Sequence, residues 1–151
     1  MTVITEQPPQ LSHSKVQKLI QSLYGFEVSV SALNSERDQN FKLKSNDGND
    51  YVLKISNPHE DIELIKLQTA ALKHIHTFDN SLQVPLPIES IEGKIINQVD
   101  GNLFRVQSFL QGQFIKNIVN PSPFILHEFG NLLGKLDLAF KEFDYPVLER
   151  Y

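Results

Sequence analysis

The residues best suited to chemistry lie in a polar turn and in the β-like segment that follows it. Residues 35–40 read Ser-Glu-Arg-Asp-Gln-Asn, and residues 51–55 read Tyr-Val-Leu-Lys-Ile. Local cations such as Arg37 and Lys54 could hold a small anionic ligand through charge-assisted hydrogen bonds. The alternative interpretation is a solvated lysine beside a charged surface turn, whose ion pairs contribute about 0–1 kcal/mol each.

The composition excludes several other kinds of site. Fourteen Lys and Arg against eighteen Asp and Glu give a net charge of -4, which argues against nucleic acid or an anionic membrane as a partner. Because the chain has no cysteine, disulfides, Cys-based zinc sites and thiol nucleophiles are excluded, and nothing calls for an oxidising compartment. No segment approaches the roughly 18 apolar residues of a membrane span, and the N-terminus lacks the pattern of a signal peptide. We therefore expect a cytoplasmic protein.

The histidines form no group suited to catalysis or metal binding. His74 and His76 are two residues apart on a predicted helix, so their side chains point to different sides. His13, His59 and His127 lack the nearby Ser and Asp of a nucleophilic triad. We expect no metal ligand among the residues of this chain.

The N-terminal half predicts a helix followed by three strands and a second helix. Apolar residues from Val16 to Leu23 follow helical spacing, between Ser12 as a cap and Gly25 as a terminator. Alternation predicts antiparallel strands at 27–33, 40–44 and 51–55, joined by turn-forming residues. The next helix is expected to begin with Asn57 as its cap and to run to about His76, with an acidic first turn.

The C-terminal half predicts short strands and a final helix. β-like runs occur around 88–91, 95–99 and 103–109, divided by Glu92-Gly93 and by Asp100-Gly101, the stronger hairpin signal. Residues 123–140 repeat apolar side chains at helical spacing. A chain of 151 residues suits one domain. We predict an α+β fold: an antiparallel sheet of about five strands with a crossing helix, preceded by one helix and followed by another.

Four segments together resemble the aminoglycoside phosphotransferase-like small-molecule kinases, and within them the hydroxylysine kinase group. They are the turn 35–41, the strand 51–55, residues 104–112 and residues 129–140. The third resembles the strand leading to the interlobe hinge, and the fourth the first helix of the large lobe. The resemblance implies a protein-kinase-like N-lobe over 11–112, after a flexible segment 1–10. Residues 113–151 would be the linker and first helix of a truncated C-lobe.

The resemblance also implies a site for ATP and Mg²⁺. Lys54 would grip the α- and β-phosphates, and the turn would cover them. Because this turn lacks the glycine pattern of protein kinases, its side chains would have to supply donors. Leu33 and Val52 would form walls for adenine, and backbone groups near 107–110 would bind its polar edge. The residues expected to bind nucleotide are Leu33, Ser35, Glu36, Arg37, Asp38, Gln39, Val52, Lys54, Glu63, Gln107 and Phe109.

The chain departs from the family pattern in two places. Kinases of this class orient the lysine with a helix carboxylate, but residues 66–68 at the centre of the helix read Lys-Leu-Gln. Glu63 is the best candidate, and it could equally complement the helix dipole. The sequence also contains no His-Gly-Asp tripeptide, which supplies the catalytic base in the family. We therefore expect no turnover from this chain alone.

Two interpretations explain this absence. In the favoured one, the chain is the N-terminal piece of a longer kinase that transfers the γ-phosphoryl of ATP to the hydroxyl of a small metabolite. Some relatives of this kind are fused to a class III aminotransferase. In the alternative, the chain is a non-catalytic binding or interaction module, and its exposed helix 123–140 pairs with a partner or with a second copy.

Overall fold

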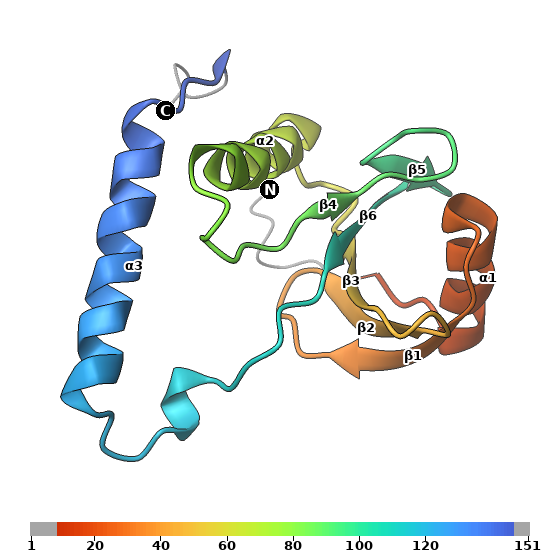
Figure 1. Ribbon diagram of the computed structural model, residues 1–151. Coiled ribbons are helices and arrows are strands. Elements are labelled where there is room, and N and C mark those ends of the chain that lie inside the picture. Colours follow the sequence, from red (N-terminus) through yellow and green to blue (C-terminus); the bar gives the residue numbers. More distant parts are fainter. Residues whose placement is uncertain (1–8, 147–151) are drawn as a thin grey trace.

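The computed structural model describes residues 9–146, apart from the side chain of Lys116. Most of the segment 1–10, predicted to be flexible, and residues 147–151 of the predicted linker-and-helix segment therefore lie outside the described residues. Figure 1 shows the order of the elements along the chain. They are α1 (His13–Tyr24), β1 (Val28–Leu33), β2 (Gln39–Ser45), β3 (Asp50–Ser56), α2 (Ile62–Phe78), β4 (Pro87–Ile88), β5 (Asn97–Val99), β6 (Asn102–Ser108), the 3-10 turn η2 (Ile115–Asn117) and α3 (Pro123–Lys141).

The strands form one antiparallel sheet in the order β1-β2-β3-β6-β4, and β5 also pairs with β6. The predicted α+β arrangement with a crossing helix is confirmed. The sheet has six strands, of which β4 is two residues long and β5 three. Asp100 and Gly101 both have positive φ, 50° and 80°, in the tight turn between β5 and β6, as the hairpin signal predicts.

The main core lies between α1 and one face of the sheet. Side chains of alternate strand residues point to opposite faces, so each strand contributes every second residue. Ser12 caps α1 by accepting a hydrogen bond from Lys15 N, and Gly25 ends it with φ 76°. The core residues of this layer are all at most 7% exposed: Val16, Ile20, Tyr24, Val28, Phe41, Leu43, Leu53, Ile55, Phe104 and Val106.

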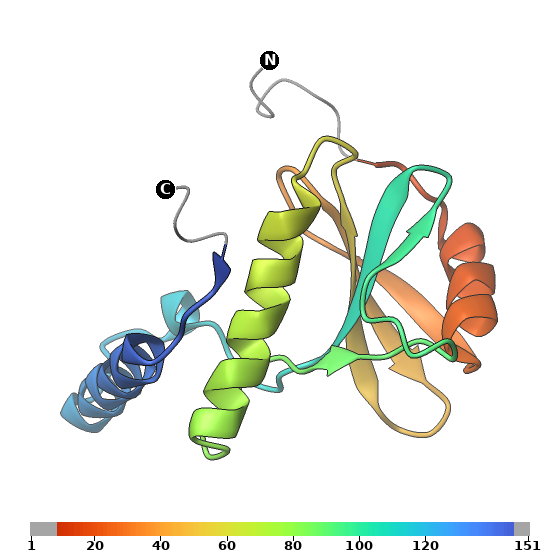
Figure 2. The same cartoon turned by 90° about the horizontal axis from the view of Figure 1, so that it is seen from above.

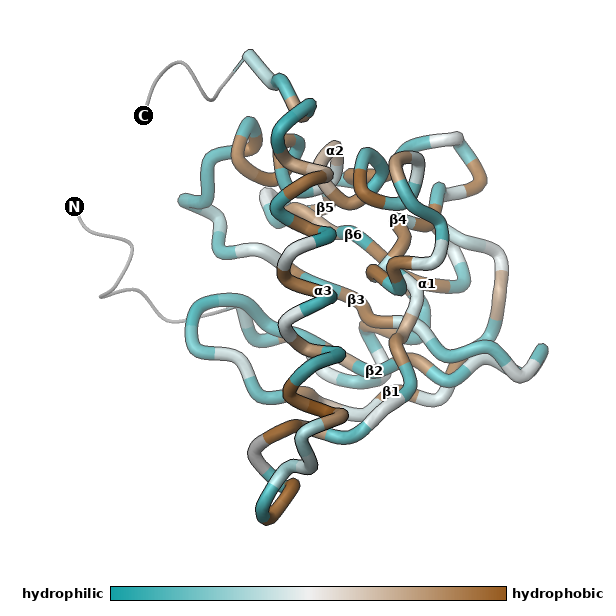
Figure 3. Tube along the Cα trace, turned by 60° about the vertical axis from the view of Figure 1, so that its left-hand side comes forward, coloured by the Kyte–Doolittle hydropathy of each residue, from teal (hydrophilic) through white to brown (hydrophobic). Residues whose placement is uncertain are grey.

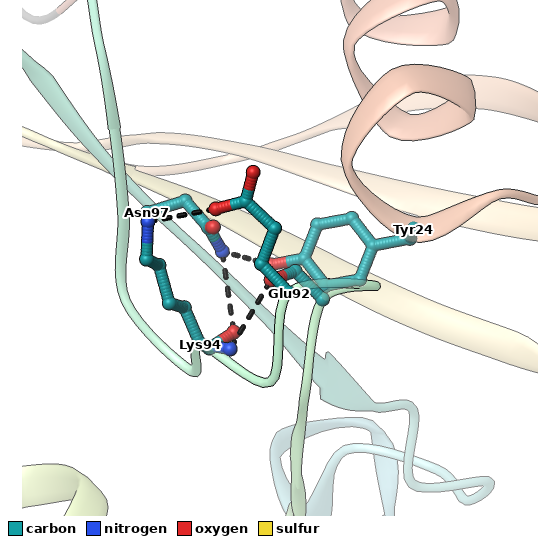
Figure 4. Close-up of polar contacts among 5 residues, drawn as sticks. Tyr24, Glu92, Lys94 and Asn97 are labelled. Carbon is teal, nitrogen blue, oxygen red and sulfur yellow. Dashed lines mark hydrogen bonds and ion pairs between the residues drawn. The ribbon is translucent and has the colours of Figure 1, made fainter.

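The loop before β5 is tied to α1. Asn97 Nδ2 donates to the hydroxyl of Tyr24 at 3.2 Å and lies near the carbonyl of Lys94, while Lys94 pairs with Glu92 (Figure 4). Burial raises the pKa of the Tyr24 phenol to about 12, and the bond from Asn97 only partly opposes this. The loop 89–96 does not form the predicted hairpin around Glu92-Gly93, because β4 and β5 both pair with β6 rather than with each other.

Helix α2 lies on the opposite side of the sheet from α1 (Figure 2). It begins at Ile62, where Asp61 accepts a hydrogen bond from Glu63 N. The predicted start at Asn57 is wrong. Asn57 instead closes a turn, since its side chain accepts from His59 N and its carbonyl accepts from Glu60 N. The sequence thus offers two capping residues before α2. Asn57 forms an Asx turn, and Asp61 caps the helix.

Helix α3 lies beyond α2, away from the sheet (Figures 1 and 2). Ser122 caps it by accepting from Ile125 N, and Pro123 occupies its first turn, where the predicted helix 123–140 begins. Its C-terminal part packs on α2, where His74 Nε2 donates to the carbonyl of Ala139 at 2.8 Å. Ala139 is the single buried residue of this helix. Among the residues that the structure describes, no helix combines the length and apolar character needed to cross a membrane.

Candidate functional site

An open pocket of about 310 Å³ lies on the face of the sheet opposite α1. The chain segments around it are the β1–β2 turn, the middle of β3 and β6, and α2 with the turn before it. Five predicted site residues line it together: Ser35, Glu36, Arg37, Asp38 and Lys54. The other lining residues are Ser56, Glu60, Gln68 and Arg105.

Lys54 occupies the middle of β3 with a polar residue on each side. Asn40 of β2 and Arg105 of β6 are its cross-strand partners. Because Leu53 and Ile55 are buried in the α1 core, alternation directs Lys54 to the pocket side. Partial burial and the nearby Arg105 cation lower the pKa of Lys54, while Asp38 acts in the opposite direction. Within residues 9–146, Lys54 forms no ion pair, so its ammonium is available to a ligand.

The turn between β1 and β2 is joined to the end of β3 by a hydrogen bond between a side chain and the backbone. Asp38 Oδ1 accepts a hydrogen bond from Asn57 N at 3.4 Å, which joins the turn to the end of β3. Glu36 and Arg37 remain exposed. The structure therefore leaves their side chains accessible to a ligand at the mouth of the pocket.

Arg105 is a pocket residue that sequence reasoning missed. It is only 4% exposed, although a charged residue is rarely this deeply buried without a partner. Its Nε and Nη1 atoms have no hydrogen-bond partner among the described residues. Burial lowers the pKa of its guanidinium, and the charges of Asp38 and Glu60 act against this. The sequence signal was a lone arginine inside the apolar run of β6.

Leu33, Val52 and Gln107 share the sheet face of Lys54 but do not line this pocket. In the register, Leu33 pairs with Asn40, next to Lys54, and Val52 pairs with Gln107. Leu33 is at the edge, 36% exposed, whereas Gln107 is buried. The three predicted adenine-side residues are therefore neighbours of the pocket on one continuous surface.

Phe109 follows β6 and packs against a lysine of β2. Lys42 Nζ lies 4.0 Å from the centroid of the Phe109 ring and 2.8 Å from Asp50 Oδ2. The backbone N–H of Phe109 donates to the carbonyl of Asp50 at 3.0 Å. That amide is therefore already engaged within the protein, whereas the predicted role concerned backbone groups over 107–110.

Gln39 and Glu63 are not brought to the pocket. The side chain of Gln39 accepts from Leu11 N at 2.7 Å and donates to Leu11 O at 3.0 Å, on the α1 side of the sheet. Glu63 pairs with Lys66 at 2.8 Å in the first turns of α2. The helix residue that reaches the pocket beside Lys54 is Gln68, an amide in place of a carboxylate.

Comparison with known proteins identifies the family. Residues 29–150 match the profile described as "Phosphotransferase enzyme family", so the chain belongs to that family. Hydroxylysine kinase of Danio rerio is 32% identical over 157 residues, covering 96% of this chain and 44% of the relative. The chain thus spans less than half the length of this curated relative.

Two solved structures share the fold. Amicoumacin kinase, solved in complex with AMP-PNP, Ca²⁺ and Ami, gives a TM-score of 0.73 at 17% identity, over 90% of this chain and 42% of that one. Spectinomycin phosphotransferase, solved with ADP and spectinomycin, gives 0.68 at 14% identity, over 92% and 40%. The chain therefore has the kinase-like N-lobe fold that the resemblance implies.

Proposed function

We propose that this chain is the ATP-binding lobe of a small-molecule kinase. The observation that carries the proposal is the position of Lys54, which faces a pocket roofed by the turn 35–38 and has no carboxylate partner in the described structure. A phosphate chain needs cations and hydrogen-bond donors that are already in place, because phosphoryl transfer depends on positioning and charge stabilisation. Lys54 on a central strand supplies one such cation with little freedom to move.

The residues present suit the phosphates better than the metal. Partly buried Lys54 and the donors of Ser35 and Arg37 can bind phosphate oxygens. Within residues 9–146, no group of three or more His, Asp or Glu side chains is placed to hold a metal ion. Mg²⁺ would neutralise charge on ATP, and we expect its protein ligands in the second lobe, as the family resemblance implies.

The proposal assigns binding, but not transfer, to this chain. The sequence has no His-Gly-Asp tripeptide to provide a catalytic base, so we expect bound ATP to remain intact. In the whole protein, the acceptor would be the hydroxyl of a small, amine-bearing metabolite, the chemistry named by the Danio rerio relative. Residues 11–112 would form the nucleotide-binding lobe, and residues 113–151 the linker and first helix of a second lobe. The absence of cysteine suits a cytoplasmic location.

A second function, a non-catalytic interaction module, is favoured by one observation. Helix α3 exposes a row of large apolar side chains, among them Phe124, Leu126 and Leu133. Surfaces of this kind commonly mark contact with another protein segment. A second copy of the chain is the partner that this alternative predicts, and it does not require a nucleotide.

The test of the proposed function is ATP binding by the 151-residue chain, followed by nuclear magnetic resonance. Half of a kinase cleft should bind ATP with a dissociation constant of about 1 mM, equivalent to about -4 kcal/mol. Lys54→Met should weaken this at least tenfold, because it removes the cation that faces the pocket. Lys44→Met is the matched control, since Lys44 lies on β2 of the same sheet and is exposed outside the pocket. Equal affinities of the two variants would contradict the proposal.

A further inference from the structure

We propose that Arg105 is a second phosphate-binding cation, which forms with Lys54 a two-cation subsite for the phosphate chain of a nucleoside triphosphate. This inference rests on the proposed function and extends it to a residue on a different strand. It assigns to β6 a part in ligand binding through a side chain.

The first observation is that the donors of Arg105 are buried and unused. The residue lines the pocket and is 4% exposed, yet its Nε and Nη1 atoms have no hydrogen-bond partner among residues 9–146. Most buried polar groups in native proteins have a partner, so an unsatisfied guanidinium calls for an explanation. A planar fork of N–H donors matches the oxygens of a phosphate group.

The second observation is that Arg105 stands directly opposite Lys54 in the register of β3 and β6. Directly opposed residues of antiparallel strands have side chains close together on one face, where like charges are unfavourable. The proximity of the two cations is also a cause of the lowered pKa of Lys54. An anion between them would offset the repulsion that the ligand-free protein retains.

The third observation is that the nearest carboxylates do not neutralise Arg105. Asp38 and Glu60 are close enough to influence its pKa, but neither carboxylate is paired with Arg105 among the ion pairs of the described part of the chain. Asp38 Oδ1 already accepts from Asn57 N. An internal salt bridge therefore does not account for the burial of the arginine.

The fourth observation is that the other unsatisfied buried atoms adjoin the same place. In the described residues they belong to Asn40 and Asn57. Asn40 is the β2 partner of Lys54, and Asn57 directly follows β3. Unused hydrogen-bonding capacity therefore adjoins Lys54 in the sheet. The Asn57 Nδ2 group is a donor that a phosphate oxygen could satisfy, whereas the Asn40 Oδ1 atom is an acceptor that phosphate does not satisfy.

The experiment titrates the 151-residue chain with ATP, inorganic tripolyphosphate and adenosine, and follows the amide and arginine Nε–H signals by nuclear magnetic resonance. Arg105→Met should weaken ATP and tripolyphosphate binding at least tenfold and leave adenosine binding unchanged. Arg105→Lys keeps the charge but loses the planar set of N–H donors, so the affinity of this variant for both anions should be intermediate. In the unsubstituted chain, the Nε–H signal of Arg105 should shift with tripolyphosphate. Lys44→Met again serves as the control.

Stability separates a ligand-binding role from a structural one. If Arg105 binds phosphate, Arg105→Met removes an unsatisfied buried charge, so the melting temperature of the ligand-free protein should stay the same or rise. A fall in melting temperature together with loss of adenosine binding would overturn the inference, because it would show a structural role.

The outcomes also separate this inference from the proposed function. If the unsubstituted chain binds neither ATP nor tripolyphosphate, both fail. If Lys54→Met weakens ATP binding and Arg105→Met does not, only the role of Arg105 is refuted. If Arg105→Met weakens binding and Lys54→Met does not, the anion site stands and the assignment of Lys54 is refuted.

Discussion

Helices α1 and α3 carry the same kind of apolar periodicity, yet the protein uses them differently. Val16 and Ile20 of α1 are completely buried, whereas Phe124 and Leu126 of α3 are 72% and 57% exposed. Figure 3 shows hydrophobic positions recurring along α3, and Figures 1 and 2 show this helix apart from the sheet. α1 meets a sheet face whose own residues are apolar, while α3 packs mainly on the end of α2. Periodicity thus predicts a helix, but not which surface will cover it.

The strongest way to break this comparison is to truncate an aromatic side chain in each region. Phe41 is 1% exposed in the α1 layer, so Phe41→Ala should lower the free energy of unfolding by about 3–5 kcal/mol through lost burial and a cavity. Phe124→Ala on α3 is the matched control and should change it by less than about 0.5 kcal/mol. Urea denaturation measures both. Similar losses would mean that α3 contributes to the same core.

The stability of the α1 layer should depend on pH in the alkaline range, because it contains the buried phenol of Tyr24. Burial raises the pKa of Tyr24 to about 12 from 10.0 in the unfolded chain. The phenol of Tyr24 therefore holds its proton more tightly in the folded state than in the unfolded chain. Its contribution to the free energy of unfolding is complete below pH 10 and is lost as the pH rises to about 12. The loss is about 2–3 kcal/mol over that interval.

Tyr24→Phe isolates this contribution from that of the titrating lysines. It should cost about 1 kcal/mol at pH 8, from loss of the hydrogen bond with Asn97, and then lose less stability than the unsubstituted protein between pH 10 and 12. If the free energy of unfolding falls equally in the two proteins between pH 10 and 12, the phenol ionises at its ordinary pKa and the prediction is wrong.

The contact between α2 and α3 predicts a smaller effect. His74 Nε2 donates to Ala139 O at 2.8 Å, so His74→Phe removes a hydrogen bond worth about 1 kcal/mol while keeping a ring that can stack on Phe78 and Phe143. Hydrogen exchange should quicken in the last turns of α3 and remain unchanged in the sheet. Quickening throughout the protein would show instead that this contact supports the whole fold.

The smallest expected change in stability belongs to the exposed face of α3. Leu133 is 50% exposed, and Leu133→Gln keeps good helix propensity, so the free energy of unfolding should shift by less than about 0.5 kcal/mol. Self-association should decrease in sedimentation at high protein concentration, because an apolar contact surface is interrupted. Unchanged association would leave this face without a role in pairing two copies.

The sequence predicted those parts of the fold that depend on neighbouring residues. Helix α1 has its cap at Ser12 and ends at Gly25, and α3 begins at Pro123, because capping and periodicity are local. Asn57 misled the prediction of α2, since an Asx turn and a helix cap use the same side-chain oxygen.

The pocket-lining residues were predictable where the family resemblance named them, in the turn 35–38 and at Lys54, and not at Arg105. Ser35 to Asp38 and Lys54 do line one pocket. Gln39, one residue further, points to the other face, because strand alternation begins there and a single step reverses direction. Arg105 became recognisable only when β6 was placed beside β3, a pairing that no local pattern encodes.

The hydrogen bonds between Gln39 and Leu11 connect the segment before α1 to the strand that follows the pocket-lining turn. These two hydrogen bonds hold the residue next to Asp38, so the segment before α1 helps to fix the turn that lines the pocket.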